Sequence, residues 1–256
     1  MDELTETQSR VVCANRDGVA EIMLNRPAKK NALDLDMYDE ISDAIDRAVA
    51  DPAVRCLLLH GAQKAFCAGN DIEVFLDKQA NILPPILRFM NALYACPKPV
   101  VAAVGGPAIG VGATMLLHCD LVYASESARF QFPFLSMGIC PEFGSSVLLI
   151  QRCGYQRAAQ LLLLCEPADG AAMRDMGLVN EVLADDALLA HARGKARRLA
   201  AMPADALHIV RGMMRRGVVE PLPDLFHYEM TQVVRMMRSD EAASLFAAFM
   251  ARKKAG

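Results

Sequence analysis

Residues 99–120 read PVVAAVGGPAIGVGATMLLHCD, and this stretch decides the fold class. No residue from Pro99 to Leu117 is charged, a run long enough for a membrane-spanning helix. Four glycines and Pro107 interrupt the run, however, and would break such a helix in its middle. We therefore expect protein core rather than a membrane span. The pattern predicts a buried strand at 99–104, a glycine loop, a buried helix near 112–118 and a strand at 121–124.

The segments upstream alternate between strand and helix patterns. Residues 11–24 predict two strands folded over the turn formed by Asp17 and Gly18. Residues 35–49 place apolar side chains at helical spacing. A short buried strand is expected at 54–60 and a helix at 82–93. This alternation predicts an α/β layered core.

After about residue 144 the pattern becomes almost wholly helical. The last helices are rich in Met and Ala, which is typical of apolar faces that pack against the core or a second subunit. We expect a core of residues 1–195 followed by a helical oligomerisation region of residues 196–256. Helices are predicted near 144–152, 155–164, 186–201, 203–216, 224–237 and 240–252.

Charge is distributed unevenly along a chain whose formal net charge is −3. Residues 193–256 carry 12 Lys and Arg against six Asp and Glu, so this quarter is basic. A basic region can bind phosphates, but the chain contains no Trp and no stacked-aromatic pattern. A small phosphorylated ligand is therefore favoured over nucleic acid.

The eight cysteines show neither a C-x-x-C pair nor the Cys/His spacing of a metal site. This spacing argues against structural zinc and against a disulfide framework, so no metal is expected. The first residues, MDELTETQSR, are polar and acidic and do not look like a secretory or mitochondrial leader. We expect a protein of the reducing cytoplasm.

Three separate segments hold glycines where the backbone must turn sharply or approach a ligand. They are KAFCAGNDI at 64–72, GGPAIGVGAT at 105–114 and GICPEFGSS at 138–146. Backbone N–H groups at helix starts are unpaired donors, and two of them aimed at one point can stabilise an oxyanion. A single glycine segment, by contrast, indicates no more than a turn.

Together with LNRPAKKNAL at 24–33 and HCDLVYAS at 118–125, these segments have a familiar order and spacing. The chain resembles the enoyl-CoA hydratase/isomerase, or crotonase, superfamily over nearly its full length. That resemblance implies a crotonase-like spiral of ββα units and a C-terminal helical trimerisation region, with trimers commonly paired as hexamers. It also implies an acyl-CoA thioester substrate, in which coenzyme A is part of the substrate and no separate cofactor is needed.

The resemblance assigns roles to individual residues of this chain. The main-chain N–H groups of Asn70 and Val111 would form the oxyanion hole for the thioester carbonyl. Val111 replaces the glycine usual at its position, which keeps the N–H but narrows the pocket. The residues implied in binding substrate or CoA are Lys29, Lys30, Ala32, Ala68, Gly69, Asp71, Ile72, Gly110, Phe134, Phe249 and Arg252.

The catalytic positions depart from the hydratase pattern. Where family hydratases carry two carboxylates, this chain has Thr114 and Phe134, neither of which is an acid or base at neutral pH. Glu142, in the turn PEFGSS, resembles the catalytic base of peroxisomal-type Δ3,Δ2-enoyl-CoA isomerases. Phe132 and Phe134 would keep its pocket dry and raise the pKa of the carboxyl.

These residues favour a Δ3,Δ2-enoyl-CoA isomerase, in which Glu142 shuttles one proton. Within the enzymes, a 2-enoyl-CoA hydratase with unorthodox carboxylates or another crotonase-type reaction is the alternative. A catalytically silent acyl-CoA-binding protein is the alternative from a different class, since a degenerate hydratase would also lose its two carboxylates. Glu142 could likewise be only an acid favoured in the first turn of a helix.

Several other polar residues are interpreted as structural. His118 and Asp120 are triad residue types, but such close neighbours on a chain cannot form a relay. Cys67 is expected to pack as a small apolar side chain. Asp71 is expected to organise its loop, with Glu73 left in solvent.

Overall fold

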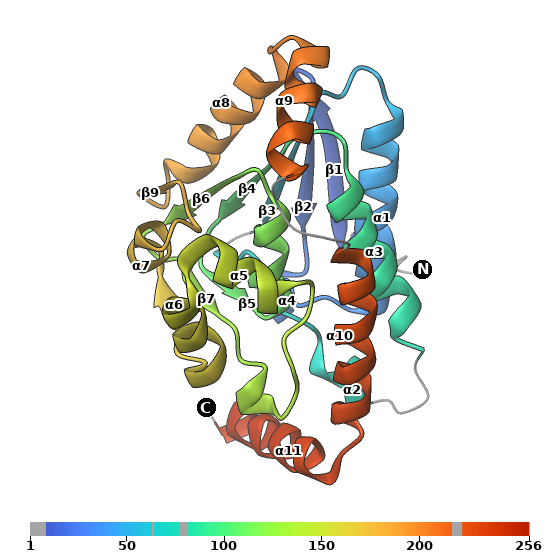
Figure 1. The fold of residues 1–256 in the computed structure, drawn as a ribbon, viewed down its shortest axis with the longest axis vertical. Helices are drawn as coiled ribbons and strands as arrows, with labels where there is room; N and C mark the ends of the chain where they lie inside the picture. Colours follow the sequence, from blue (N-terminus) through green and yellow to red (C-terminus); the bar gives the residue numbers. More distant parts are fainter. Residues whose placement is uncertain (1–8, 63, 77–80, 217–221, 256) are drawn as a thin grey trace, which may run out of the picture.

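The computed structural model describes residues 9–62, 64–76, 81–216 and 222–255, and its strands form two sheets (Figure 1). The larger sheet has the strand order β1-β2-β3-β4-β6-β9. Its strands are β1 (Val11–Arg16), β2 (Val19–Leu24), β3 (Cys56–Gly61), β4 (Val100–Val104), β6 (Leu121–Ser125) and β9 (Glu181–Leu183). The smaller sheet has the order β5-β7-β8, with β5 (Pro107–Ile109), β7 (Arg129–Gln131) and β8 (Ala168–Asp169).

The large sheet begins with the predicted hairpin and continues in parallel. Strands β1 and β2 pair antiparallel with Arg16 opposite Val19. Asp17 and Gly18 between them have φ angles of 52° and 75°, which a two-residue hairpin turn requires. From β2 onward every neighbouring pair in this sheet is parallel. Parallel strands need crossover connections, and the helices of the chain supply them.

Both faces of this sheet are covered, as the uncharged strands predict. Leu57 and Leu59 of β3 face the larger hydrophobic core, whereas Cys56 and Leu58 face a second cluster. Helix α1 (Leu35–Ala50) packs on α3 (Leu83–Ala95), and both contribute to the larger core. Helix α8 (Leu188–Ala200) covers the opposite face with alanines spaced four residues apart, so it can approach the strands closely.

The remaining helices follow in chain order. They are α2 (Ile72–Leu76), α4 (Val111–Thr114), α5 (Ser145–Cys153), α6 (Tyr155–Ala159), α7 (Gly170–Asp175), α9 (Ala204–Arg216), α10 (Leu222–Met237) and α11 (Asp240–Ala255). Single 3₁₀ turns occur at η1 (Pro27–Lys29), η2 (Met115–His118) and η3 (Leu135–Met137), and a π turn at η4 (Gln160–Leu164). Among the described residues, no helix has the length and apolar content needed to cross a bilayer.

The structure confirms the α/β core and corrects the prediction beyond residue 144. That part is not wholly helical, because β8 and β9 each complete a sheet there. Strands of two and three residues are too short to show a period-2 pattern. The helix expected near 112–118 begins at Val111 and tightens to a 3₁₀ turn at Met115. The expected division at residue 195 falls inside α8.

The decisive stretch packs its backbone directly on the loop after β3. Cys67 donates its N–H to the Pro107 carbonyl and accepts from the Ile109 N–H, both at 2.9 Å. A Cβ atom on Gly112 would lie 2.4 Å from the carbonyl oxygen of Cys67. Only a residue without a side chain fits there, which explains the glycine in this loop.

We expect Gly112→Ala to destabilise the protein by about 3 kcal/mol, because the added methyl group overlaps immovable backbone. The matched control is Gly194→Ala in α8, where a Cβ atom meets nothing within 4 Å. That variant should be neutral or more stable by up to about 1 kcal/mol. Urea unfolding of both variants measures the difference, and equal stabilities would contradict the packing described here.

Candidate active site

A cavity of about 400 Å³ opens beside the loop after β3, the start of α4 and helix α11. Asn70 lies on one part of its wall and Val111 on another, while Phe134 and Phe249 supply aromatic surface. Among the described residues, the wall consists of Ala68, Gly69, Asn70, Ile72, Ile109, Gly110, Val111, Gln131, Pro133, Phe134, Ser136, Met137, Ile139, Leu245, Ala248 and Phe249. The lining is mainly apolar, which suits an acyl chain or another apolar group.

Two backbone N–H groups from separate segments of this wall, those of Asn70 and Val111, are candidates for binding an oxyanion. In the described part of the chain, neither the N–H of Asn70 nor that of Val111 donates a hydrogen bond. Leu33 accepts from the Asp71 N–H and donates to the Gly69 carbonyl, so the Asn70 N–H points away from Leu33. Gly110, at φ 54° and ψ −121°, turns the chain so that Val111 starts α4. Two free donors on one wall can bind an oxyanion.

The Glu142 carboxyl lies behind this wall, not on it. Glu142 is 4% exposed, and the hydroxyl of Thr114 donates a hydrogen bond to its Oε1. Thr114 lies three residues after Val111 on α4. The same short helix therefore supplies both the free Val111 N–H and the hydroxyl that binds the Glu142 carboxyl. The pKa of Glu142 is raised to about 8: burial is the main cause, the Thr114 hydrogen bond opposes it, and the nearby Glu229 adds to the rise.

The turn that carries Glu142 is held from several sides. Phe143 and Gly144 both adopt left-handed backbone, with φ angles of 56° and 71°. The His118 ring stacks on Phe143, and its Nε2 lies 2.9 Å from the Phe143 carbonyl oxygen. Since a carbonyl can only accept, Nε2 must carry the proton. Burial lowers the pKa of His118 to about 3, so this histidine is a neutral structural donor.

Comparisons with known proteins place these features in a family. The family model described as enoyl-CoA hydratase/isomerase matches residues 14–256. The chain belongs to the enoyl-CoA hydratase/isomerase family. It is 33% identical to a probable enoyl-CoA hydratase of Rhizobium meliloti, covering 98% of this chain and 96% of that one. It is 30% identical to rat enoyl-CoA delta isomerase 2, covering 98% of this chain and 66% of the relative.

Solved structures agree with this membership. The structure of OdaA from Pseudomonas aeruginosa superimposes with a TM-score of 0.91 at 39% identity, covering 95% of this chain and 99% of that one. The resemblance drawn from the sequence motifs is therefore confirmed, as is the crotonase fold. This enoyl-CoA hydratase/isomerase is an enzyme that acts on acyl-CoA thioesters.

The structure brings many of the predicted binding residues of this family member to one cavity. Ala68, Gly69, Ile72, Gly110, Phe134 and Phe249 share its wall with Asn70 and Val111. Phe132, which was expected to help dry the pocket, is fully buried. Arg252 belongs to α11, but its side chain lies outside the described residues.

Four predicted CoA-binding residues are not on the cavity wall. Asp71 pairs with Arg26 at 2.7 Å, an interaction that holds the loop, as expected. Although burial opposes it, the hydrogen bond from Arg26 lowers the pKa of Asp71. Lys29 pairs with Glu73 at 3.0 Å, and the Glu73 side chain is exposed to solvent, as expected. The backbone carbonyl of Lys30 accepts a hydrogen bond from the Ala68 N–H. Ala32, two residues later in the chain, is buried.

Sequence reasoning misses Glu229, a buried acid of α10 near Glu142. One signal was available, because Glu229 follows Phe226 by three residues and precedes Met230 and Val233 on an apolar helix face. A carboxyl on such a face must be paired inside the protein. Sequence reasoning also misses Leu245 and Ala248 of α11, because no sequence motif identifies them as part of the cavity wall.

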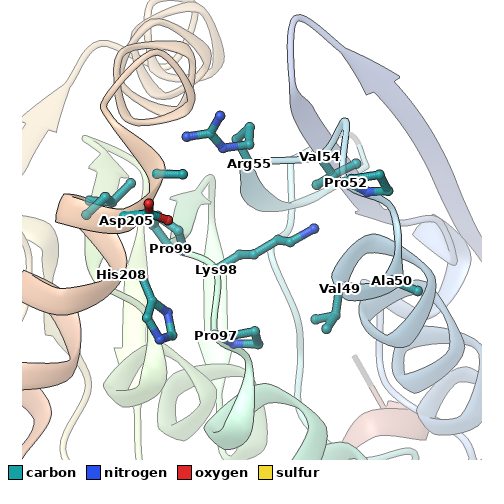
Figure 2. A pocket seen from close by; sticks show the side chains of 12 residues that line it. Val49, Ala50, Pro52, Val54, Arg55, Pro97, Lys98, Pro99, Asp205 and His208 are labelled. Carbon is teal, nitrogen blue, oxygen red and sulfur yellow. The ribbon is translucent and has the colours of Figure 1, made fainter.

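A second cavity, of about 460 Å³, lies between the end of α1 and α9 (Figure 2). Figure 2 shows Lys98 extending across it toward the end of α1. The Lys98 ammonium donates to the carbonyls of Ala48 and Asp51 at 2.6 and 2.7 Å. It therefore caps a helix C-terminus, and none of the predicted site residues lines this cavity.

The raised pKa of Glu142 makes stability depend on pH. The folded chain binds this proton more tightly than the unfolded chain, so the stabilisation is complete below pH 4.5 and is lost as pH rises through about 8. Between these values wild-type protein should lose about 1.4 kcal/mol per pH unit relative to Glu142→Gln. Urea unfolding of both proteins at pH 5 to 9 measures this, and a pH-independent difference would contradict it.

The Thr114 hydroxyl stabilises the Glu142 carboxylate, so Thr114→Val should raise the Glu142 pKa by about one unit. Thr114→Ser keeps the hydroxyl and serves as the control. Carbon-13 NMR titration of labelled glutamate carboxyls measures the change, with Glu142→Gln assigning the signal. A Thr114→Val protein that titrates at or below the wild-type pH would disprove the interaction.

Proposed function

We propose that this enzyme is a Δ3,Δ2-enoyl-CoA isomerase. The observation that carries the proposal is the buried carboxyl of Glu142, with its raised pKa, next to a cavity where the backbone N–H groups of Asn70 and Val111 donate no hydrogen bond within the described chain. The two positions where hydratases of the family would carry carboxylates hold Thr114 and Phe134. Thr114 hydrogen-bonds Glu142, and Phe134 lines the cavity with an apolar ring.

The proposed reaction needs one acid–base group. The Glu142 carboxylate removes a proton from C2 of a 3-enoyl thioester, and the electrons of the C–H bond form a dienolate. The N–H groups of Asn70 and Val111 stabilise the negative charge on the thioester oxygen. Glu142 then returns the proton to C4, the double bond moves to C2–C3, and the carboxylate is regenerated.

The elevated pKa matches this shuttle. A carboxyl with an ordinary pKa is a weaker base, whereas a pKa near the working pH favours both removal and return of the proton. Hydration instead needs one group to activate water and another to protonate carbon. The described part of the cavity wall contains no carboxyl group for that second role.

The relatives support both this reaction and a second candidate. The rat relative is named an enoyl-CoA delta isomerase, and the Rhizobium relative a probable enoyl-CoA hydratase. Hydration of a 2-enoyl-CoA is therefore the second candidate. A different crotonase-type reaction, or binding of acyl-CoA without turnover, are the remaining outcomes of the assay below.

The proposal also covers the oligomeric state, the cofactor requirement and the cellular location. We infer that the region 196–256 builds trimers, paired as hexamers, because α9 exposes Ile209, Val210, Met213 and Met214. Coenzyme A enters as part of the substrate, and no other cofactor is needed for the proton shuttle. We infer a cytoplasmic location from the eight cysteines, whose spacing shows no disulfide framework.

The proposal is tested with a 3-enoyl-CoA and, in parallel, a 2-enoyl-CoA. Growth of conjugated-thioester absorbance from the first substrate is the expected result. Loss of that absorbance from the second would instead establish hydration. Acyl-CoA binding with no change in either assay would refute both activities.

Glu142→Gln should lower the isomerase kcat by at least about 100-fold, because it removes the group that carries the proton. Calorimetric affinity for a saturated acyl-CoA should stay within threefold of wild type, because Gln matches Glu in size and leaves the residues that line the cavity unchanged. Glu126→Gln, an exposed glutamate without a side-chain hydrogen bond in the described chain, is the matched control. A fully active Glu142→Gln protein would exclude Glu142 as the base.

A further inference from the structure

Glu229 is a buried carboxyl that the reaction described above does not use. It lies on α10, is 5% exposed and is absent from the cavity wall. Its Oε2 accepts the backbone N–H of Gly144 at 2.7 Å, and its Oε1 accepts the hydroxyl of Ser146 at 2.5 Å. Both oxygens therefore bind the start of α5, more than 80 residues earlier in the chain.

These hydrogen bonds act on the turn that presents Glu142. Phe143 is a non-glycine residue in left-handed backbone, a conformation that persists only where the surroundings hold it. Without Glu229 the buried N–H of Gly144 would have no acceptor in the described chain. Phe226, which also belongs to α10, packs edge-on to Phe143, with ring centroids 5.1 Å apart.

We propose that Glu229 is a positioning residue for Glu142, through which helix α10 holds the 141–144 turn and sets the protonation range of the Glu142 carboxyl. This inference rests on the proposed role of Glu142 as the base. Glu229 does not touch the cavity, so it acts through the turn and through its charge.

The groups around Glu142 leave Glu229 as its ionisable partner. Burial raises the pKa of the Tyr38 hydroxyl and of the Cys67 and Cys140 thiols, so all three are uncharged near neutral pH. His118 is neutral because burial lowers its pKa. The positive charge of Arg235, on α10, partly opposes the rise in the pKa of the Cys140 thiol. Burial also raises the pKa of Glu229, while its hydrogen bonds from Ser146 and Gly144 favour the carboxylate.

Glu229→Gln tests the charge while keeping an acceptor for Gly144 and a polar partner for Ser146. Without the neighbouring negative charge, the Glu142 carboxylate becomes easier to form. The ascending limb of kcat against pH should therefore move to lower pH by about half a unit or more. Glu126→Gln should leave the profile unchanged. Glu229→Ala, which removes both hydrogen bonds, should lower kcat by about tenfold or more with KM within threefold.

A second measurement does not depend on activity. Carbon-13 titration of labelled carboxyls, with the Glu142 signal assigned by Glu142→Gln, should show the same shift in Glu229→Gln. An unchanged titration in that variant would overturn the proposal. So would a folded Glu229→Ala protein whose kcat equals that of wild type. If wild type does not isomerise 3-enoyl-CoA, the proposed function fails, and the titration alone decides whether Glu229 controls Glu142.

Discussion

The main-chain contact between residues 66–69 and 107–112 is the constraint on which the rest of the site depends. Cys67 hydrogen-bonds Pro107 and Ile109, and Gly112 sits against the Cys67 carbonyl with no space for a side chain. Because two parallel parts of the chain are held this closely, Asn70 and Val111 share one cavity with their N–H groups free. The sheets fix the ends of both segments, so the donors are placed before any ligand arrives.

Features with a local physical cause could be predicted from the sequence. Asp17 and Gly18 allow the left-handed turn of the hairpin, and the apolar face of α1 repeats at helical spacing. Glycines interrupted the uncharged stretch and correctly excluded a single long helix. The choice of Glu142 depended on family resemblance, because an acid near a helix start has an equally good local explanation.

Features that depend on distant partners could not be predicted in this way. Strands β8 and β9 form because each pairs with the edge strand of a sheet. Two or three residues have no strong preference of their own for strand backbone. Glu229 reads as an ordinary helix residue until α10 is placed against Gly144. The ion pairs of Lys29 with Glu73 and of Asp71 with Arg26 join side chains more than 40 residues apart, so no local pattern indicates them.

The cavity takes its wall from both halves of the chain, including Ala68, Gly69, Asn70 and Ile72 from the first half and Leu245, Ala248 and Phe249 from α11. A ribosome adds residues from the N-terminus, and domains fold as the chain emerges. The loop with the free N–H groups is therefore made long before the helix that closes over it. The described part of the last dozen residues contains no strand of either sheet, but it includes Leu245, Ala248 and Phe249 of the cavity wall, so the end of the chain completes the pocket rather than the sheets.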